Sequence, residues 1–159
     1  MSIPLRVTSY LEHHGVRYEV CAHAYSRTSA QTARQAHLPP HLLAKSVLIE
    51  DDDGCVLAVL PADRQVRLGQ LARLLGRHDL HLADESRVAD VMSGCLRGAV
   101  PAVGMAWGLE TVVDDELAGN EVVYFEAGDH ERLLRLTRDQ FAALMREARH
   151  GCIAGERTH

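Results

Sequence analysis

Lys45 is the first residue of this sequence whose type suggests chemistry. It is the only lysine in the chain, and the other 16 lysine-or-arginine positions are all arginine. Lysine is a compact point charge, so a lone lysine among arginines indicates a position that needs that geometry. The pattern of residues 42–50 predicts a strand, on which the lysine shares one face with Leu43, Val47 and Ile49.

This apolar face makes the position of Lys45 informative. An ammonium group among apolar neighbours is costly unless it has a partner or lies at the rim of a cavity. We therefore expect Lys45 to point inward at a site. The alternative is that the strand begins later, or that the side chain reaches the surface along its apolar stem.

A glycine- and proline-containing loop is the second candidate. Residues 98–104 read Gly-Ala-Val-Pro-Ala-Val-Gly. Glycine lets a backbone approach a ligand closely, and proline stiffens a turn. Backbone N–H groups of such a loop could bind a carbonyl oxygen or an oxyanion formed during ester cleavage. The alternative is a plain surface connection.

The third candidate is the turn expected at residues 127–130, between two predicted strands. Its Asp129 and His130 are adjacent, and a turn there would place them at the rim of a sheet. His130 could orient a substrate or transfer a proton. The alternative is a turn with two solvated side chains.

Other common chemistries lack their motifs. The histidines and cysteines do not form the paired spacing of a structural zinc site, and HExxH, GxSxG, Walker and strand-linked GxGxxG motifs are missing from the sequence. We expect no metal and no cofactor. The cysteines are far apart and are expected to be reduced; a nucleophilic Cys55 or Cys95 is an alternative to a buried structural thiol.

Length and charge restrict the function further. The 159 residues predict one domain, and the 47% hydrophobic content fits a globular chain. A net charge of −5 argues against a protein that binds duplex DNA generally, but it is compatible with a protein that binds only the end of a nucleic acid. Apolar runs fall short of the ~18–20 residues of a membrane span. No signal peptide is visible, so we expect a cytoplasmic protein without membrane contact.

The elements that must position these candidates follow from periodicity and turn residues. Capping boxes at Thr28 and Thr137 and a cap at Asp84 each predict a helix start. The expected helices cover residues 4–14, 29–37, 68–75, 85–91 and 138–149, and the expected strands cover residues 16–22, 42–50, 55–60, 111–113, 121–127 and 132–136. This predicts one compact α+β domain over residues 1–150, with six or seven mostly hairpin-connected strands, helices packed outside, and a flexible tail at 151–159.

The order of these features resembles a known family. After a first helix come "GVRYEV", a histidine, a short helix, "LLAKSVLIEDDDG", "VLAVLPADRQVRLGQLARLLG", "HLADESRVADVMSG", "GAVPAVG" and "EVVYFEAGDHERLLRLT". Over residues 4–147 the sequence is similar to the YbaK-like, prolyl-tRNA-synthetase-associated editing domains. The resemblance implies a mixed, barrel-like sheet. It also implies a trans-acting aminoacyl-tRNA deacylase that removes a small, wrongly attached amino acid, most often from proline tRNA.

The resemblance also implies roles for particular residues. It makes Lys45 and Gly104 catalytic, with Lys45 holding the terminal phosphate or polarising the ester carbonyl. The substrate-binding residues it implies are Thr28, Ser46, Gly98, Val100, Pro101, Val103, Asp129 and His130. The sequence departs from the family at Gln31 and Thr32, where many relatives carry an acidic pair, and at Val103, which replaces an aromatic residue.

The implied partner is the 3′ end of a mischarged tRNA, with a synthetase or an elongation factor as a possible helper. One alternative is a non-catalytic module of the same fold that binds a tRNA end or a protein. Another is a hydrolase of a different small acyl ester or nucleotide. Deacylation of mischarged tRNA separates the non-catalytic module from an editing enzyme, and competition by uncharged tRNA or a short acceptor-stem hairpin separates the other hydrolase.

Overall fold

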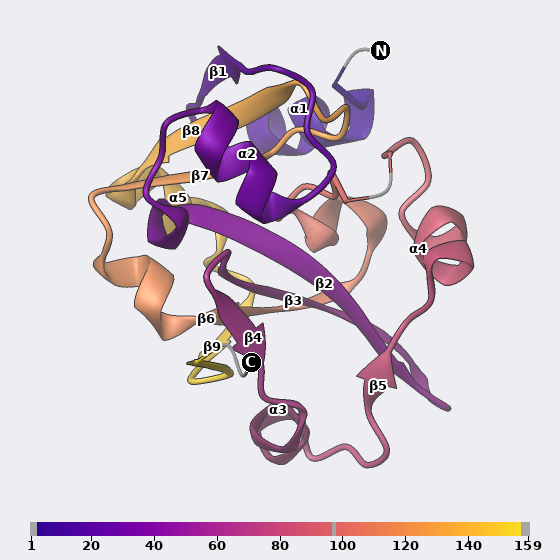
Figure 1. Ribbon diagram of the computed structural model, residues 1–159. Coiled ribbons are helices and arrows are strands. Elements are labelled where there is room, and N and C mark those ends of the chain that lie inside the picture. Colours follow the sequence, from indigo (N-terminus) through magenta and orange to yellow (C-terminus); the bar gives the residue numbers. More distant parts are fainter. Residues whose placement is uncertain (1–2, 97, 157–159) are drawn as a thin grey trace.

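The computed structural model describes residues 3–96 and 98–156 of the chain. Its helices are α1 (Leu5–His13), α2 (Ser29–Gln35), α3 (Leu68–Leu75), α4 (Glu85–Val91) and α5 (Arg138–Leu144), with 3₁₀ turns η1 (Pro40–Leu42), η2 (Gly104–Trp107) and η3 (Asp115–Gly119). Its strands are β1 (Glu19–Ala22), β2 (Leu43–Asp51), β3 (Gly54–Pro61), β4 (Arg64–Val66), β5 (His81–Leu82), β6 (Glu110–Asp114), β7 (Val122–Glu126), β8 (Arg132–Thr137), β9 (Arg149–Gly151) and β10 (Ala154–Glu156). Figure 1 shows the long β2–β3 hairpin crossing the molecule.

The main sheet is mixed, as expected. Its order is β1-β8-β7-β2-β3-β6-β9, and β5 also pairs with β2. The pairs β2–β7, β3–β6 and β6–β9 are parallel, and the other pairs of this sheet are antiparallel. The expected α+β architecture is confirmed. The strands beyond the expected six or seven are β4, β5, β9 and β10, which have two or three residues each and are too short to show a periodicity.

The concave side of the sheet encloses the largest apolar core. Alternate residues of β2, β3, β6, β7 and β8 contribute to it, and α1 and α5 close it. Its fully buried members include Leu57, Val123, Phe125 and Leu134. Side chains from five strands therefore meet in one cluster.

Two smaller apolar clusters lie on the other face of the sheet. Near its start, β2 packs Leu43 against Ala33 of α2. Farther along the same face, Ile49 packs with Leu71 of α3. Figure 1 shows α2 across the near half of β2 and α3 beyond β4. Lys45 lies on this face between Leu43 and Ile49, so its predicted apolar neighbours are correct, but helices rather than the main core cover them.

The β2–β3 hairpin is held at its far end by a charged contact. The Asp51 carboxylate accepts the N–H groups of Asp53 and Gly54 and hydrogen bonds from Arg77, which follows α3. These bonds, chiefly the one from Arg77, lower the pKa of Asp51 to about 2. The turn and α3 are therefore tied together, which fixes the direction in which the hairpin projects.

One edge of β2 changes partner along its length. The other edge pairs with β3 from Ala44 to Asp51. On this edge, Leu43 and Ala44 pair with β7, and Ile49 and Glu50 pair with β5. Among the described residues, no strand pairs with positions 45–47 on this edge. β2 therefore parts from β7 immediately before Lys45.

The predicted helix starts are confirmed at atomic level. Thr28, Asp84 and Thr137 each accept the backbone N–H three residues farther along. The last helix is shorter than expected, because α5 ends at Leu144 and Arg149 begins β9. No helix in the described part of the chain is long and apolar enough to cross a membrane.

The segment after residue 151 was expected to be flexible, but the structure shows it ordered as far as residue 156. Ile153 is fully buried, and β10 pairs with β4. The buried carboxylate of Asp114 accepts the N–H groups of Ile153 and Ala154 at 2.9 and 3.0 Å. Long-range pairing thus orders the chain as far as Glu156, and the rest of the expected tail, 157–159, lies outside the described residues.

Replacing Asp114 by alanine should destabilise the fold. The substitution leaves the N–H groups of Ile153, Ala154 and Glu116 without their acceptor, and an unsatisfied buried donor costs about 1–3 kcal/mol. We expect the free energy of unfolding, measured in urea, to fall by at least about 2 kcal/mol. The matched control is Asp52→Ala in the exposed hairpin turn, for which equal destabilisation would contradict this account.

Candidate active site

A cavity of about 260 Å³ opens where β2 parts from β7. Its position at a strand edge lets it collect side chains from both faces of the sheet, from the start of α2 and from α4. The residues that line it are Thr28, Ser29, Lys45, Ser46, Val47, Leu48, Leu57, Leu82, Ala83, Val88, Gly98, Val100 and Glu126. It is therefore a small, mostly apolar site with a few polar groups, which is the usual character of a ligand pocket.

Lys45 lies at the point where the two strands separate. The parallel register pairs Leu43 with Tyr124 and Ala44 with Phe125. The next residues along the two strands are Lys45 and Glu126, and both line the cavity. Among the described lining residues, these two are the only basic and the only acidic side chains. The parting of the strands thus places one cation and one anion at the same site.

Ser46 contributes a hydroxyl from the other face of β2. Its Oγ is buried and has no hydrogen-bond partner within the described part of the chain. Its neighbours in the wall include Leu48 and Leu57, which belong to the main core. A buried polar atom without a partner is costly, so this hydroxyl is suited to receive a polar group of a ligand.

Thr28 combines a structural contact with a place in the wall. Its Oγ1 accepts the N–H of Gln31 at 3.2 Å, and the Gln31 side chain accepts the N–H of Arg27 at 2.9 Å. The capping box predicted from the sequence therefore fixes the start of α2 at the mouth of the cavity.

The glycine-proline loop is only partly at the cavity. Gly98 and Val100 line it, whereas Pro101, Val103 and Gly104 are buried elsewhere. A Cβ on Gly104 would lie 2.3 Å from the Thr111 hydroxyl, so this glycine is packed tightly against β6. The structure thus gives Gly104 a packing position in place of direct contact with the cavity.

Gly98 is constrained by its backbone and its neighbours. Its φ is +75°, and a Cβ there would lie 2.5 Å from the carbonyl oxygen of Arg27 and 3.2 Å from the His130 ring. Only glycine satisfies both conditions without displacement. The loop is therefore pressed directly against the residue that precedes Thr28.

The turn at residues 127–130 packs against the loop that carries Gly98. The buried Asp129 carboxylate accepts hydrogen bonds from the backbone N–H groups of Glu131 and Arg132, both at 3.0 Å. It also forms an ion pair with the Arg132 side chain. It is used within its own turn, and neither it nor His130 lines the cavity. His130, with φ of +65°, packs near Gly98 and 5.3 Å from the Tyr25 ring. Both residues support the loop, and their contact with substrate remains a prediction.

Glu126 is the charged lining residue that the sequence analysis missed. Its carboxylate accepts a 2.6 Å hydrogen bond from Thr32, and Thr32 lies 2.6 Å from the Ser26 hydroxyl. Burial raises the pKa of Glu126, and the Thr32 bond and the nearby His23 oppose part of that shift. The available signal was a single carboxylate within the otherwise apolar strand 122–126.

Cysteine and metal chemistry receive no support from the geometry. All four cysteines are unpaired, and burial raises the pKa of the Cys95 thiol to about 12, which disfavours the nucleophilic thiolate. Within residues 3–96 and 98–156, no three histidine, cysteine or acidic side chains come close enough to hold a metal ion.

Comparison with known proteins decides the family. Residues 23–144, more than half of the chain, match the aminoacyl-tRNA editing domain. The chain belongs to this family. The match includes β2, β7 and the loop at 98–104, so it spans the walls of the cavity. No curated protein sequence matches the chain.

Solved structures support the same fold for this editing domain. A proposed trans-editing enzyme for prolyl-tRNA synthetase has 26% identity and a TM-score of 0.81, over 94% of this chain and 95% of that one. A scaffold from computational epitope grafting has 27% identity and a TM-score of 0.80, over 97% and 96%. A hypothetical protein at 21% identity has a TM-score of 0.84, over 94% and 99%, and shows the fold alone.

The close approach of the loop to Arg27 can be tested with two glycines of similar conformation. Gly98 and Gly108 have φ of +75° and +72°, but a Cβ on Gly108 would meet nothing within 4 Å. Both alanine variants carry the same backbone strain, and only Gly98→Ala adds a steric clash. We expect Gly98→Ala to lower the free energy of unfolding in urea by at least about 1 kcal/mol more than Gly108→Ala. Equal losses would show that the loop is not pressed against Arg27.

Proposed function

We propose that this editing domain is a trans-acting deacylase that hydrolyses the ester of a small, wrongly attached amino acid on tRNA. The observation that carries the proposal is the small cavity containing Lys45, in a chain that belongs to the aminoacyl-tRNA editing family. Proline tRNA is the proposed substrate, supported by the structural neighbour related to prolyl-tRNA synthetase. The proposed setting is the cytoplasm, with a synthetase or an elongation factor as a helper.

The groups at the cavity suit ester hydrolysis. An aminoacyl ester is already activated, so the site must place a water molecule and stabilise the negative charge on the carbonyl oxygen. Water adds to the ester carbonyl, and the ribose oxygen leaves with a proton, releasing the free amino acid and tRNA. A ribose hydroxyl of the substrate assists the water, which explains how the reaction proceeds without a visible catalytic triad.

Lys45 is the proposed source of positive charge in this reaction. It polarises the ester carbonyl or holds the phosphate of the terminal adenosine. The Ala99 N–H already donates to Leu96 at 3.1 Å, so the N–H groups of Gly98 and Val100 are the loop donors proposed for the carbonyl oxygen. Both residues line the same cavity as Lys45.

The size of the cavity supports a choice of small amino acids. The volume of about 260 Å³ has to hold the ester and part of the terminal ribose as well as the side chain, and Val47, Leu57 and Val88 bound the space that remains. A single methylene changes binding by only ~1–3 kcal/mol in a synthetase, so a second site that admits only the smaller product is useful. The unpartnered Ser46 hydroxyl supports a small polar side chain among the accepted ones.

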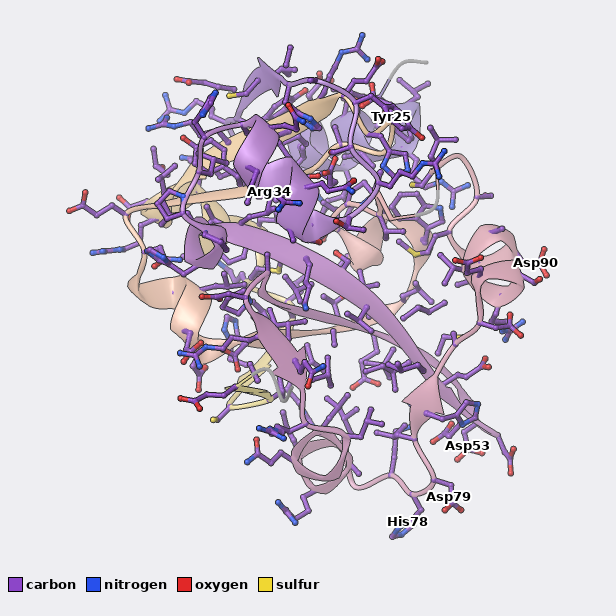
Figure 2. All side chains as sticks on the ribbon, viewed as in Figure 1. Tyr25, Arg34, Asp53, His78, Asp79 and Asp90 are labelled. Atoms are coloured by element: carbon purple, nitrogen blue, oxygen red, sulfur yellow. The ribbon has the colours of Figure 1, made fainter. Side chains whose placement is uncertain are left out.

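The distribution of charge supports recognition of a tRNA end. Figure 2 shows Arg34 on α2 and Tyr25 in the segment before it, whereas Asp53 and Asp79 lie at the far end of the molecule. The cavity opens beside the start of α2. A tRNA that approaches from the α2 side thus avoids these acidic residues, so the overall charge of −5 is compatible with holding only the 3′ end and a few phosphates.

Removal of the Lys45 charge should abolish most of the activity. In Lys45→Ala we expect kcat/KM for the deacylation of proline tRNA mischarged with alanine to fall by about 100-fold or more. The reason is that the stabilising charge at the ester carbonyl or the phosphate is lost. The rate is measured as release of the amino acid from purified mischarged tRNA.

Lys45→Arg is the matched control, since it keeps the charge but replaces the compact ammonium by a planar group. We expect it to recover only part of the rate. Unchanged turnover in Lys45→Ala would remove the lysine from the mechanism. No turnover by the wild-type protein across alanyl-, seryl- and cysteinyl-tRNA would favour the non-catalytic binding module.

The size of the cavity can be tested on one helix. Val88 of α4 lines the cavity, whereas Val91 of the same helix does not. We expect Val88→Ala to raise kcat/KM for prolyl-tRNA relative to alanyl-tRNA by about tenfold, because the removed methyl groups make room for a larger side chain. Val91→Ala should leave this ratio unchanged, and an unchanged ratio in Val88→Ala would contradict selection by size at this wall.

A further inference from the structure

Glu126 holds a carboxylate in a position that the fold and the hydrolytic chemistry described so far do not require. It is the last residue of β7, and the register places it beside Lys45 where the strands part. Its side chain is only 6% exposed, and it lines the cavity. An unpaired carboxylate in an apolar site is costly, so a group at this position needs a compensating partner.

One oxygen of this carboxylate is already held in place. Glu126 Oε1 accepts the Thr32 hydroxyl at 2.6 Å, and the Thr32 Oγ1 lies 2.6 Å from the Ser26 Oγ. Both hydroxyl residues are buried. If Ser26 donates to Thr32, a continuous chain of donors ends on Glu126 and fixes the orientation of its carboxylate.

The second oxygen lacks a hydrogen-bond donor within the described part of the chain. Glu126 Oε2 is buried without such a partner, and the fully buried His23 Nε2 lies 3.7 Å away. His23 Nδ1 lies 2.7 Å from the carbonyl oxygen of Ala24 and donates to it. The 3.7 Å between His23 Nε2 and Glu126 Oε2 is too long for a hydrogen bond, so Oε2 can still accept one from a donor in the cavity.

The substrate proposed above supplies such a donor. Every free aminoacyl ester carries an ammonium group on the carbon next to its carbonyl. A site that binds both the ammonium group and the ester carbonyl must therefore offer a hydrogen-bond acceptor for the ammonium close to the donor that binds the carbonyl oxygen. Lys45 and Glu126 each follow directly after the last paired residue of β2 and β7, respectively. The two adjacent strands therefore place an acceptor and a cation next to each other.

We infer that Glu126 Oε2 accepts a hydrogen bond from the α-ammonium group of the aminoacyl ester, with Thr32 as a positioning residue. This inference rests on the proposed function and specifies its substrate class. The site accepts esters with a free amino group and rejects peptidyl-tRNA and other N-acylated esters, which lack the charge and add bulk. The acidic side chain among the described residues that line the cavity is supplied by β7.

The test compares esters that differ only at the α position. Alanyl-tRNA, its α-hydroxy counterpart lactyl-tRNA and N-acetylalanyl-tRNA are given to the wild type and to Glu126→Gln. We expect the wild type to prefer alanyl-tRNA over lactyl-tRNA by at least about tenfold in kcat/KM. In Glu126→Gln, the rate on alanyl-tRNA should fall by at least about tenfold, and the rate on lactyl-tRNA should stay within about twofold.

Two further variants separate recognition from folding. Glu121→Gln, an exposed residue immediately before β7, is the matched control and should change neither rate. Thr32→Val removes the hydroxyl that orients the carboxylate. It should raise KM for alanyl-tRNA while leaving KM for lactyl-tRNA unchanged, a difference that a loss of folded protein would not produce.

A binding measurement keeps this inference distinct from the proposed function. The amide analogues 3′-alanylamino- and 3′-lactylamino-3′-deoxyadenosine cannot be hydrolysed readily and are titrated by calorimetry. Preference for the alanyl analogue in the wild type, lost in Glu126→Gln, supports the inference even if no ester is turned over. An equal effect of Glu126→Gln on both analogues, or no effect on either, would overturn it.

Discussion

The separation of β2 from β7 is the constraint on which the site depends. The two strands pair in parallel for two residues, Leu43–Tyr124 and Ala44–Phe125, and then diverge. The other edge of β2 stays paired with β3 from Ala44 to Asp51, so the strand itself remains extended and ordered. The result is a rigid wall with one open edge, which is where the cavity lies.

The surrounding elements hold this opening at a fixed width. The α2 helix packs on Leu43 near the start of β2, and β5 pairs with Ile49 beyond the gap. The loop carrying Gly98 is pressed against Arg27, and His130 of the turn around Asp129 packs near the same glycine. The protein residues that line the cavity are therefore held by backbone pairing and close packing. Such a site favours precise placement of a ligand over rearrangement of its walls.

The parts of this arrangement that were predictable have local signals. The caps at Thr28, Asp84 and Thr137 and the β2–β3 hairpin depend on neighbouring residues, and the structure confirms them. Lys45 was found because its residue type is unique in the chain and its strand is otherwise apolar. The resemblance to an editing domain added the family, which residues 23–144 confirm.

The parts that were missed depend on contacts between distant segments. Glu126 lies beside Lys45 only because β7 pairs in parallel with β2, a pairing that no local pattern contains. Ile153 is buried through its bond to Asp114, 39 residues earlier in the chain. The Asp129 carboxylate, by contrast, is held by local bonds to its own turn and to Arg132, and its contact with substrate remains a prediction.

The central claim is that the cavity between Lys45 and Glu126 receives the aminoacyl end of tRNA. A crystal structure with 3′-alanylamino-3′-deoxyadenosine bound tests it most directly. We predict the alanyl group inside the cavity, with its carbonyl toward Lys45 or the N–H groups of Gly98 and Val100. An analogue bound elsewhere on the protein, with this cavity unchanged, would contradict the account.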